Sequence, residues 1–238
     1  LYDLNSRSKL PRRLDKFNNV RSINFSQNGR LIIMSADFDG QNDLFLLSTK
    51  RDRLRRLTND LYDDLDPSFI PNTNKIVFSS NRTSDSLRTT HKADFQKLSS
   101  VYNLFTLNLD SASSFLKKIT NTMSKDYAPL AADMYNFYYL SDQRGIVNLF
   151  KYNTNTGIYT QLTNFSSSIT AYDLNFTTGT LTLVSAKKTQ QHIFAARNFD
   201  FNKSVFTPAT RRKELQQARA MQDKRSKDES KTNMSTKA

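Results

Sequence analysis

Four aspartates lie within seven residues of one another, at Asp60, Asp63, Asp64 and Asp66. Carboxylates at this spacing could hold a cation together with backbone carbonyls. The stretch lacks the glycine and the final glutamate of an EF-hand loop. Aspartates also form turns and cap backbone amides, and we favour this second role for the cluster.

The chain offers little to metal or nucleophile chemistry. Its two histidines, His91 and His192, lie far apart in the sequence, and it has no cysteine. Neither a zinc signature nor thiol catalysis is therefore indicated. No G-x-S-x-G motif and no glycine-rich phosphate loop occurs. A Ser-His-Asp triad is recognised by its geometry, so the sequence alone does not exclude one. We predict no catalytic, metal-binding or cofactor-binding residue and expect that the chain is not an enzyme.

Basic pairs precede a recurring tripeptide three times, at Arg12-Arg13, Arg55-Arg56 and Lys117-Lys118, and a fourth copy has Thr160-Gln161 instead. On an outer strand, cations protect a sheet edge from unwanted pairing. Alternatively, they could form a rim that faces anionic lipid headgroups. The net charge of +13 also permits contact with nucleic acid. No nucleic-acid-binding module is present, so we expect no nucleic-acid partner.

An internal repeat positions these residues. The tripeptide occurs as Leu57-Thr58-Asn59, Ile119-Thr120-Asn121 and Leu162-Thr163-Asn164, with degenerate copies that begin at Leu14 and Phe206. The spacings are 43, 62, 43 and 44 residues. Two other markers follow the same rhythm, a serine that ends an apolar strand and a polar-aliphatic-Phe step. They are Ser35, Ser79, Ser141 and Ser185, and the steps that begin at Asp43, Asn103, Asn148 and His192.

Each full unit contains four short strands that are apolar on both faces. In the last unit we expect them at 173–176, 181–185, 193–197 and 204–207. Four-stranded units of about 40–45 residues are typical of propeller blades. The sequence therefore predicts an all-β fold, a β-propeller of about four and a half four-stranded antiparallel blades that form an incomplete ring.

The units also define the domains. Residues 1–19 match strands c and d of a unit and predict a half-blade, so we expect that upstream residues are missing. Residues 20–208 predict four blades, with an insertion at about 83–100. Residues 209–238 predict a tail that is helical to about residue 224 and disordered beyond it, either a linker or a partner-binding helix.

The insertion lies between strands b and c of its unit. Because meander strands alternate in direction, it should share a face with the acidic cluster. Long loops in compact domains are often functional. We therefore name candidate partner contacts on this face: Asp60, Asp63, Asp64, His91, Phe95 and Leu98.

The run from Leu57 to Arg82 resembles the WD-like repeat of TolB-type β-propellers, through Leu57-Thr58-Asn59, Pro67-Ser68-Phe69 and Ile76-Val77-Phe78. The resemblance spans about residues 1–208, although the proline is kept in only one other unit, at Pro129. It implies a bacterial envelope protein, periplasmic or associated with the outer membrane, in which the propeller binds another envelope protein. Large envelope proteins of Bacteroidetes-type bacteria and prolyl-oligopeptidase-like enzymes carry similar propellers.

Three functional hypotheses follow. The first is a non-catalytic propeller that serves as a protein-interaction platform. The second is the substrate-gating propeller of a larger hydrolase whose catalytic domain lies outside this sequence. The third is a spacer between other domains. No apolar run approaches the roughly 18 residues of a membrane span, and we expect an open ring of blades to self-associate.

Overall fold

The computed structural model describes residues 1–9, 11–12, 14–51, 53–87, 98–110, 116–188 and 190–235, with the backbone alone at 224 and 227–235. Within these residues the chain forms five antiparallel sheets and one helix. Blade A consists of β3 (Asn19–Phe25), β4 (Leu31–Phe38), β5 (Gln41–Ser48) and β6 (Leu54–Arg56). Blade B consists of β7 (Asp64–Phe69), β8 (Lys75–Ser80), β9 (Asn103–Asn108) and β10 (Lys117–Lys118).

Blade C consists of β11 (Asp126–Ala131), β12 (Asn136–Ser141), β13 (Asn148–Asn153) and β14 (Ile158–Gln161). Blade D has three strands, β15 (Ile169–Asn175), β16 (Thr180–Lys187) and β17 (Gln190–Ala196). A hairpin of β1 (Tyr2–Asp3) and β2 (Ser8–Lys9) precedes the blades, and helix α1 (Arg211–Ser235) follows them.

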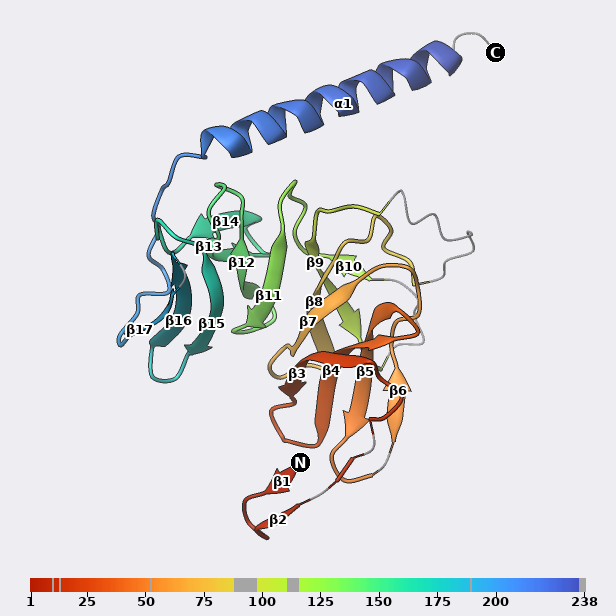
Figure 1. Ribbon diagram of the computed structural model, residues 1–238, viewed down its shortest axis with the longest axis vertical. Helices are drawn as coiled ribbons and strands as arrows, with labels where there is room; N and C mark the ends of the chain where they lie inside the picture. The colour runs from red at the N-terminus through yellow and green to blue at the C-terminus, as the bar shows by residue number, and fades with distance from the viewer. Residues whose placement is uncertain are drawn as a thin grey trace.

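The blades succeed one another along an arc, with α1 projecting beyond the sheets (Figure 1). In each blade the strands pair in chain order. The first strands of neighbouring blades lie side by side, β3 with β7 and β7 with β11, so they occupy the inner side of the arc. The predicted all-β propeller fold is thus confirmed.

Apolar side chains from both faces of each inner blade form the core. Ile33 and Leu44 of blade A pack against Phe78 and Phe105 of blade B. Corresponding clusters join blade B to blade C and blade C to blade D. Because each inner sheet is buried on both faces, its strands contain continuous apolar runs rather than alternating ones.

The repeated threonine has a structural explanation. In blade A, the Thr58 hydroxyl accepts a hydrogen bond from the Leu44 amide at 3.0 Å and donates one to Asp43 Oδ1 at 3.1 Å. Thr120 and Asn103 of blade B, and Thr163 and Asn148 of blade C, form the same arrangement. The tripeptide and the polar-aliphatic-Phe step therefore recur together because they bind each other.

The serine marker is less uniform than its spacing suggested. Ser35 Oγ and Ser79 Oγ each donate to a backbone carbonyl of the next blade, Asp64 O and Asp126 O, at 2.7 Å. Ser141 pairs instead with Asp126 of its own blade, the position that Ser80 holds in blade B. Its Oγ donates to Asp126 Oδ1 at 2.6 Å. Only the first two serines thus join neighbouring blades in this way.

The last unit differs from the prediction, because residues 204–207 are not the fourth strand of blade D. They lie along the outer edge of blade C, where the Val205 amide donates to Gln161 O at 2.9 Å. Phe199 and Phe201, which precede them, pack into the core between blades C and D. We call residues 197–210 the strap, since this segment returns across blade C.

Both ends of the chain also differ from expectation. In the predicted half-blade, β1 pairs with β2 at residues 8–9 rather than with Arg12 or Leu14. Leu14 and Phe17 pack on blade A instead. The tail was expected to be disordered beyond residue 225, but α1 continues to Ser235. At its start, the Lys213 ammonium is buried and lies 3.0 Å from Asp142 Oδ1, which anchors the helix to blade C.

Candidate functional site

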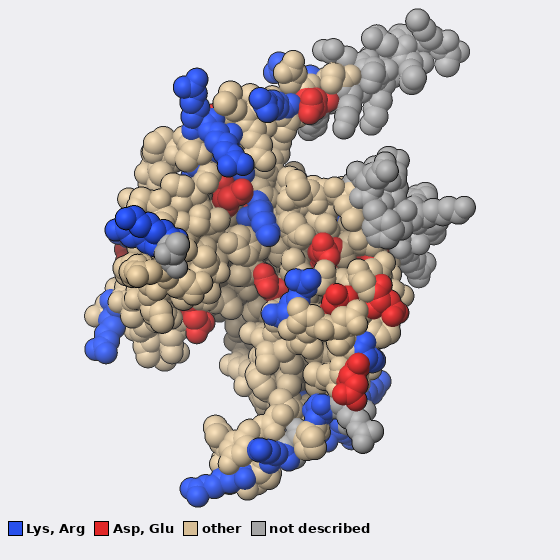
Figure 2. All heavy atoms as spheres, viewed as in Figure 1, with Lys and Arg blue, Asp and Glu red and all other residues tan. Residues whose placement is uncertain are grey.

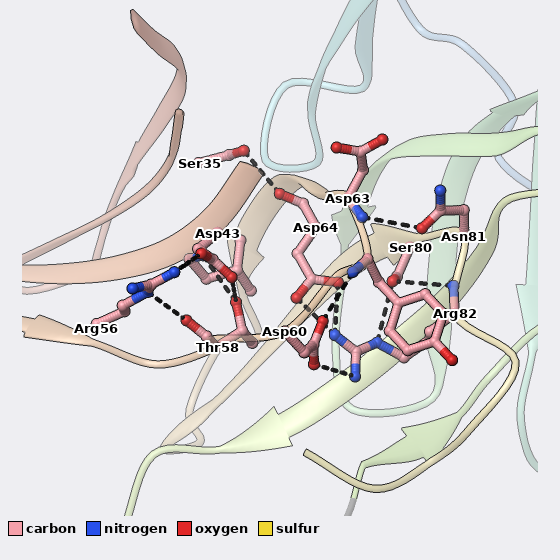
Figure 3. A network of polar contacts seen from close by, with 12 residues as sticks. Ser35, Asp43, Arg56, Thr58, Asp60, Asp63, Asp64, Ser80, Asn81 and Arg82 are labelled. Atoms are coloured by element: carbon pink, nitrogen blue, oxygen red, sulfur yellow. Dashed lines mark hydrogen bonds and ion pairs between the residues drawn. The ribbon is translucent and has the colours of Figure 1, made fainter. Parts of the chain in front are cut away.

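The acidic cluster lies where the loop before β7 meets the residues that follow β8 (Figure 3). Tyr62 Oη lies 3.1 Å from Thr83 Oγ1, the first residue of the insertion, and the Asp63 amide donates to Asn81 Oδ1 at 2.9 Å. We call this side of the propeller the insertion face. The structure thus brings the acidic cluster and the start of the insertion together, as the alternation of strand directions predicts.

Arg82 is the centre of the buried part of this site. Its Nη2 atom donates to both oxygens of Asp64, at 2.8 and 2.6 Å, and its Nη1 atom lies 3.2 Å from Asp60 Oδ2. Nε donates to Ser80 Oγ at 3.0 Å. The arginine and both aspartates have almost no exposed surface. Burial raises the pKa of Asp64, while the Arg82 guanidinium opposes that shift.

Aromatic rings enclose the guanidinium of Arg82. Its carbon atom lies 5.3 Å from the ring centroid of Tyr62, 5.8 Å from that of Phe78 and 5.9 Å from that of Phe105. Cation–π contacts of this kind favour arginine over lysine. The ion pairs and the rings together hold Arg82 in place, so the group joins the blade A–B loop to blade B rather than offering charge to solvent.

A second ion pair lies beside the first, in blade A (Figure 3). Arg56 binds Asp43 through Nη2, and its Nε donates to Thr58 O at 3.0 Å. Burial raises the pKa of Asp43 to about 6, although Arg56 and Thr58 both favour the ionised form. This carboxyl therefore titrates closer to neutrality than an exposed aspartate does.

Asp63 belongs to a third, half-exposed group. Its Oδ1 atom accepts a hydrogen bond from Asn42 Nδ2 at 2.5 Å, and its Oδ2 atom accepts one from Tyr102 Oη at 3.2 Å. Arg21 Nε in turn donates to Asn42 Oδ1. Burial and the Asp63 charge raise the pKa of Tyr102 to about 12, so this phenol stays protonated as a donor.

The remaining aspartate, Asp66, lies at a bulge in β7 with a backbone φ of 51°. Its Oδ2 atom accepts a hydrogen bond from the amide of Ala128, the corresponding bulge residue of blade C, at 3.2 Å. Asp60 likewise caps the Tyr62 amide, at 3.1 Å. These contacts agree with the capping role that the sequence favoured for the cluster.

The candidate partner contacts divide into three groups. Asp60 and Asp64 are buried against Arg82, so their carboxylates are not available to a partner and their role is structural. Asp63 is half-exposed, and so is Leu98. His91 and Phe95 lie outside the described residues. Among the four of these residues that the structure describes, Asp63 is the one whose contacts and exposure suit an interaction site.

Sequence reasoning missed Arg82, Asn42 and Tyr102. Arg82 follows the apolar strand that ends at Ser80, within the repeat motif itself, so its position was visible but its partners were not. His192, the first residue of the last polar-aliphatic-Phe step, is exposed on β17.

The described residues contain no group of three or more histidine, aspartate or glutamate side chains placed to hold a metal. In the same part of the chain, no helix combines the length and the hydrophobicity that a membrane span needs. What the site offers chemically is hydrogen bonding and charge, arranged on one face of the propeller.

Known proteins resemble this chain in sequence and in fold. The chain matches no family model. It is 27% identical to the Tol-Pal system protein TolB of Helicobacter hepaticus, over a stretch that covers 55% of this chain and 40% of that protein. The chain therefore spans less than half the length of this curated relative.

Solved structures share the fold at low sequence identity. A putative TolB from Agrobacterium tumefaciens superimposes with a TM-score of 0.61 at 12% identity, over 77% of this chain and 66% of that one. TolB from Acinetobacter baumannii gives 0.55 at 15%, over 77% and 41%. A puromycin-hydrolyzing peptidase of Mycobacterium tuberculosis gives 0.54 at 11%, over 76% and 28%. The resemblance to TolB-type propellers is thus confirmed: the chain forms a β-propeller whose fold is similar to that of TolB.

Proposed function

We propose that this chain is a protein-binding propeller of a bacterial envelope, located in the periplasm or at the outer membrane, and that its partner docks on the insertion face. The curated relative is named as a component of the Tol-Pal system, which supports the envelope assignment. The half-exposed polar groups on the insertion face support the docking site.

The observation that carries the proposal is a row of alternating charges across three blades. Arg21, Asp63 and Lys125 lie at or just before the first strands of blades A, B and C, and each has its charged group near the surface. Asn42 connects Arg21 to Asp63 through hydrogen bonds. Tyr102 connects Asp63 to Lys125, because its Oη atom donates to Asp63 and its ring centroid lies 5.2 Å from the Lys125 ammonium. In the view of Figure 2, basic and acidic side chains are interspersed across the middle of the molecule.

A row of this kind suits recognition of a protein surface. Alternating charges select a partner with the complementary pattern and disfavour others more than they add affinity. Hydrogen bonds hold Arg21 and Asp63, and two aromatic rings contact Lys125, before any partner arrives. Little side-chain entropy is therefore lost on binding.

The alternative function is the gating propeller of a larger hydrolase. The observation that favours it is the fold that this chain shares with the puromycin-hydrolyzing peptidase. The two functions differ in what lies on the insertion face, which would be a stable protein partner in the first case and a catalytic domain of the same polypeptide in the second.

Site-specific photo-crosslinking tests the proposal. A crosslinking residue at Lys125, in the full chain added to an envelope extract, should capture a separate protein that mass spectrometry identifies. The same residue at Ile158, an exposed position at a turn on the opposite face, should not capture it. The Asp63→Lys variant should lose the product, because it places a cation between two others.

Two results would contradict the proposal. One is equal capture at positions 125 and 158, and the other is a product that Asp63→Lys leaves unchanged. Cell fractionation of the full-length gene product checks the location independently, and recovery in the cytoplasmic fraction would refute the envelope assignment.

A further inference from the structure

Three of the four blades protect their outer edges, in two different ways. Edge strands β6 and β10 carry the basic pairs Arg55-Arg56 and Lys117-Lys118. Cations at an edge discourage pairing with another strand. Blade C has Thr160-Gln161 at this place, and the strap covers its edge. Val205 N donates to Gln161 O, and Gln161 Nε2 donates to Thr207 Oγ1 at 3.0 Å.

Blade D has neither protection. Its outermost strand is β17, whose seven residues are all exposed and uncharged, with Ile193 at 79% and Phe194 at 46% exposure. Within the described residues, no strand pairs with its outer side. An exposed, uncharged edge of this length is a ready template for another strand.

An apolar pocket of about 360 Å³ lies directly beside this edge. Its wall includes Leu162, Phe165, Leu181, Leu183, Phe194 and Phe199. In blades A and B the corresponding space receives a leucine of the fourth strand, Leu54 or Leu116, which packs into the core. In blade D the residue opposite that position is Ala196, and no fourth strand supplies a leucine to fill the space.

The complete blades also show how a fourth strand binds. The amides of Leu57, Ile119 and Leu162 donate to the carbonyls of Leu44, Leu104 and Leu149 at 2.8, 2.7 and 2.9 Å. The amides of the latter three residues donate to the hydroxyls of Thr58, Thr120 and Thr163. Ile193 occupies this position in blade D. Its amide and carbonyl therefore point toward the free edge.

The segments of this chain that could fill the site are used elsewhere. Residues 204–207, which the period assigns to the fourth strand of blade D, pair with blade C. Leu14, from the degenerate first copy of the tripeptide, packs on blade A. A strand at β17 must therefore come from outside the described part of this chain.

We propose that β17 binds an extended segment of a partner protein, which becomes the fourth strand of blade D. The segment has the pattern of the complete blades, a large apolar residue, two polar residues, leucine or isoleucine, then Thr-Asn. Its first apolar side chain fills the pocket beside Ala196, and its backbone pairs with Ile193. Backbone pairing gives affinity and the pocket gives specificity in this mode of recognition. The site shares no residue with the charged row on the insertion face and stands independently of the function proposed above.

A labelled peptide with the sequence of residues 115–122, Phe-Leu-Lys-Lys-Ile-Thr-Asn-Thr, provides the probe. Titrated with the full chain, it should bind with a saturable rise in fluorescence anisotropy. N-methylation of its isoleucine removes the donor that Ile119 uses in blade B and should weaken binding by about tenfold or more. A peptide of the same composition in scrambled order controls for attraction by charge.

Two variants of the protein locate the binding. Ala196→Phe fills the pocket and should weaken binding by about tenfold or more. Ala171→Phe makes the same change on the opposite face of the same sheet and should leave binding unchanged. Ile193→Pro removes an amide that points toward the free edge and makes no bond to β16. It should therefore weaken peptide binding, even if the side chains around Ala196→Phe repack.

Several outcomes would overturn the proposal. The first is that the peptide does not bind. The second is that N-methylation of the peptide and both edge variants leave binding unchanged. The third is that Ala171→Phe weakens binding as much as Ala196→Phe does. Light scattering gives a further one: if the chain alone forms dimers that Ala196→Phe abolishes, the edge is occupied by a second copy and not by a partner.

Discussion

Blades B and C both begin with a buried aspartate, Asp64 and Asp126, and the two carboxylates are stabilised in opposite ways. Asp64 has a cation, Arg82. Asp126 has hydroxyl donors, Ser141 Oγ at 2.6 Å and Thr122 Oγ1 at 2.9 Å. Burial raises the pKa of both carboxyls.

Blade D gives a third solution at the same position, where Ile169 replaces the aspartate and packs in the core. The comparison shows that the position demands a side chain compatible with burial, and not a particular chemistry. A second position also changes from charged to uncharged residues along the chain, because Asp43 and Arg56 of blade A correspond to Asn148 and Gln161 of blade C. Of these two positions, blade B has an ion pair at the first and blade A at the second, and blade C has an ion pair at neither.

The largest effect should come from Arg82→Met. It leaves Asp60 and Asp64 buried without a cation, and loss of one partner of a buried ion pair costs about 3–5 kcal/mol. Urea unfolding of the full chain measures the change in the free energy of unfolding. Adding Asp60→Asn and Asp64→Asn to Arg82→Met should recover part of the loss. A loss below about 1 kcal/mol would mean that the ion pairs are not decisive.

A smaller effect should follow from Asp126→Ala, the matching change in blade C. It removes the acceptor for two hydroxyls, which costs about 1–3 kcal/mol when a buried donor is left without a partner. The same unfolding assay applies. A loss as large as that of Arg82→Met would contradict the distinction between the charged and the uncharged interface.

The smallest effect at neutral pH should come from the double change Asp43→Asn with Arg56→Gln, which gives blade A the residues of blade C. Replacing a buried pair as a whole is often nearly neutral, so we expect a change within about 1 kcal/mol at pH 7. The variant also removes a titrating group. Since the folded-state pKa of Asp43 is raised to about 6, the native protein binds that proton more tightly than the unfolded chain.

The stability of the unsubstituted chain relative to this variant should therefore fall as the pH rises from about 4 to about 6, and then level off. Unfolding free energies of both proteins, measured across this range, give the difference. A difference that rises with pH, or that stays flat, would show that Asp43 does not hold a raised pKa.

The amino-acid sequence by itself determined the repeat, and through it the fold class and most strand positions. The Thr58, Thr120 and Thr163 markers were reliable because each binds a partner within its own blade, at a fixed distance along the chain. Local contacts of this kind recur with the period, so the period reveals them.

Only the tertiary structure decided what happens between blades and at the ends of the array. The sequence suggested that Asp60 and Asp64 form turns or contact a partner. The structure shows that both pair with Arg82, which lies 18 residues after Asp64. Residues 204–207 fit the period of a fourth strand, yet they pair with blade C, whose edge lacks the basic pair. Residues 204–207 could form similar backbone hydrogen bonds with the edge of blade C or with that of blade D. The edge that they pair with therefore depends on which apolar surface the preceding residues cover, and Phe199 and Phe201 cover the surface between blades C and D.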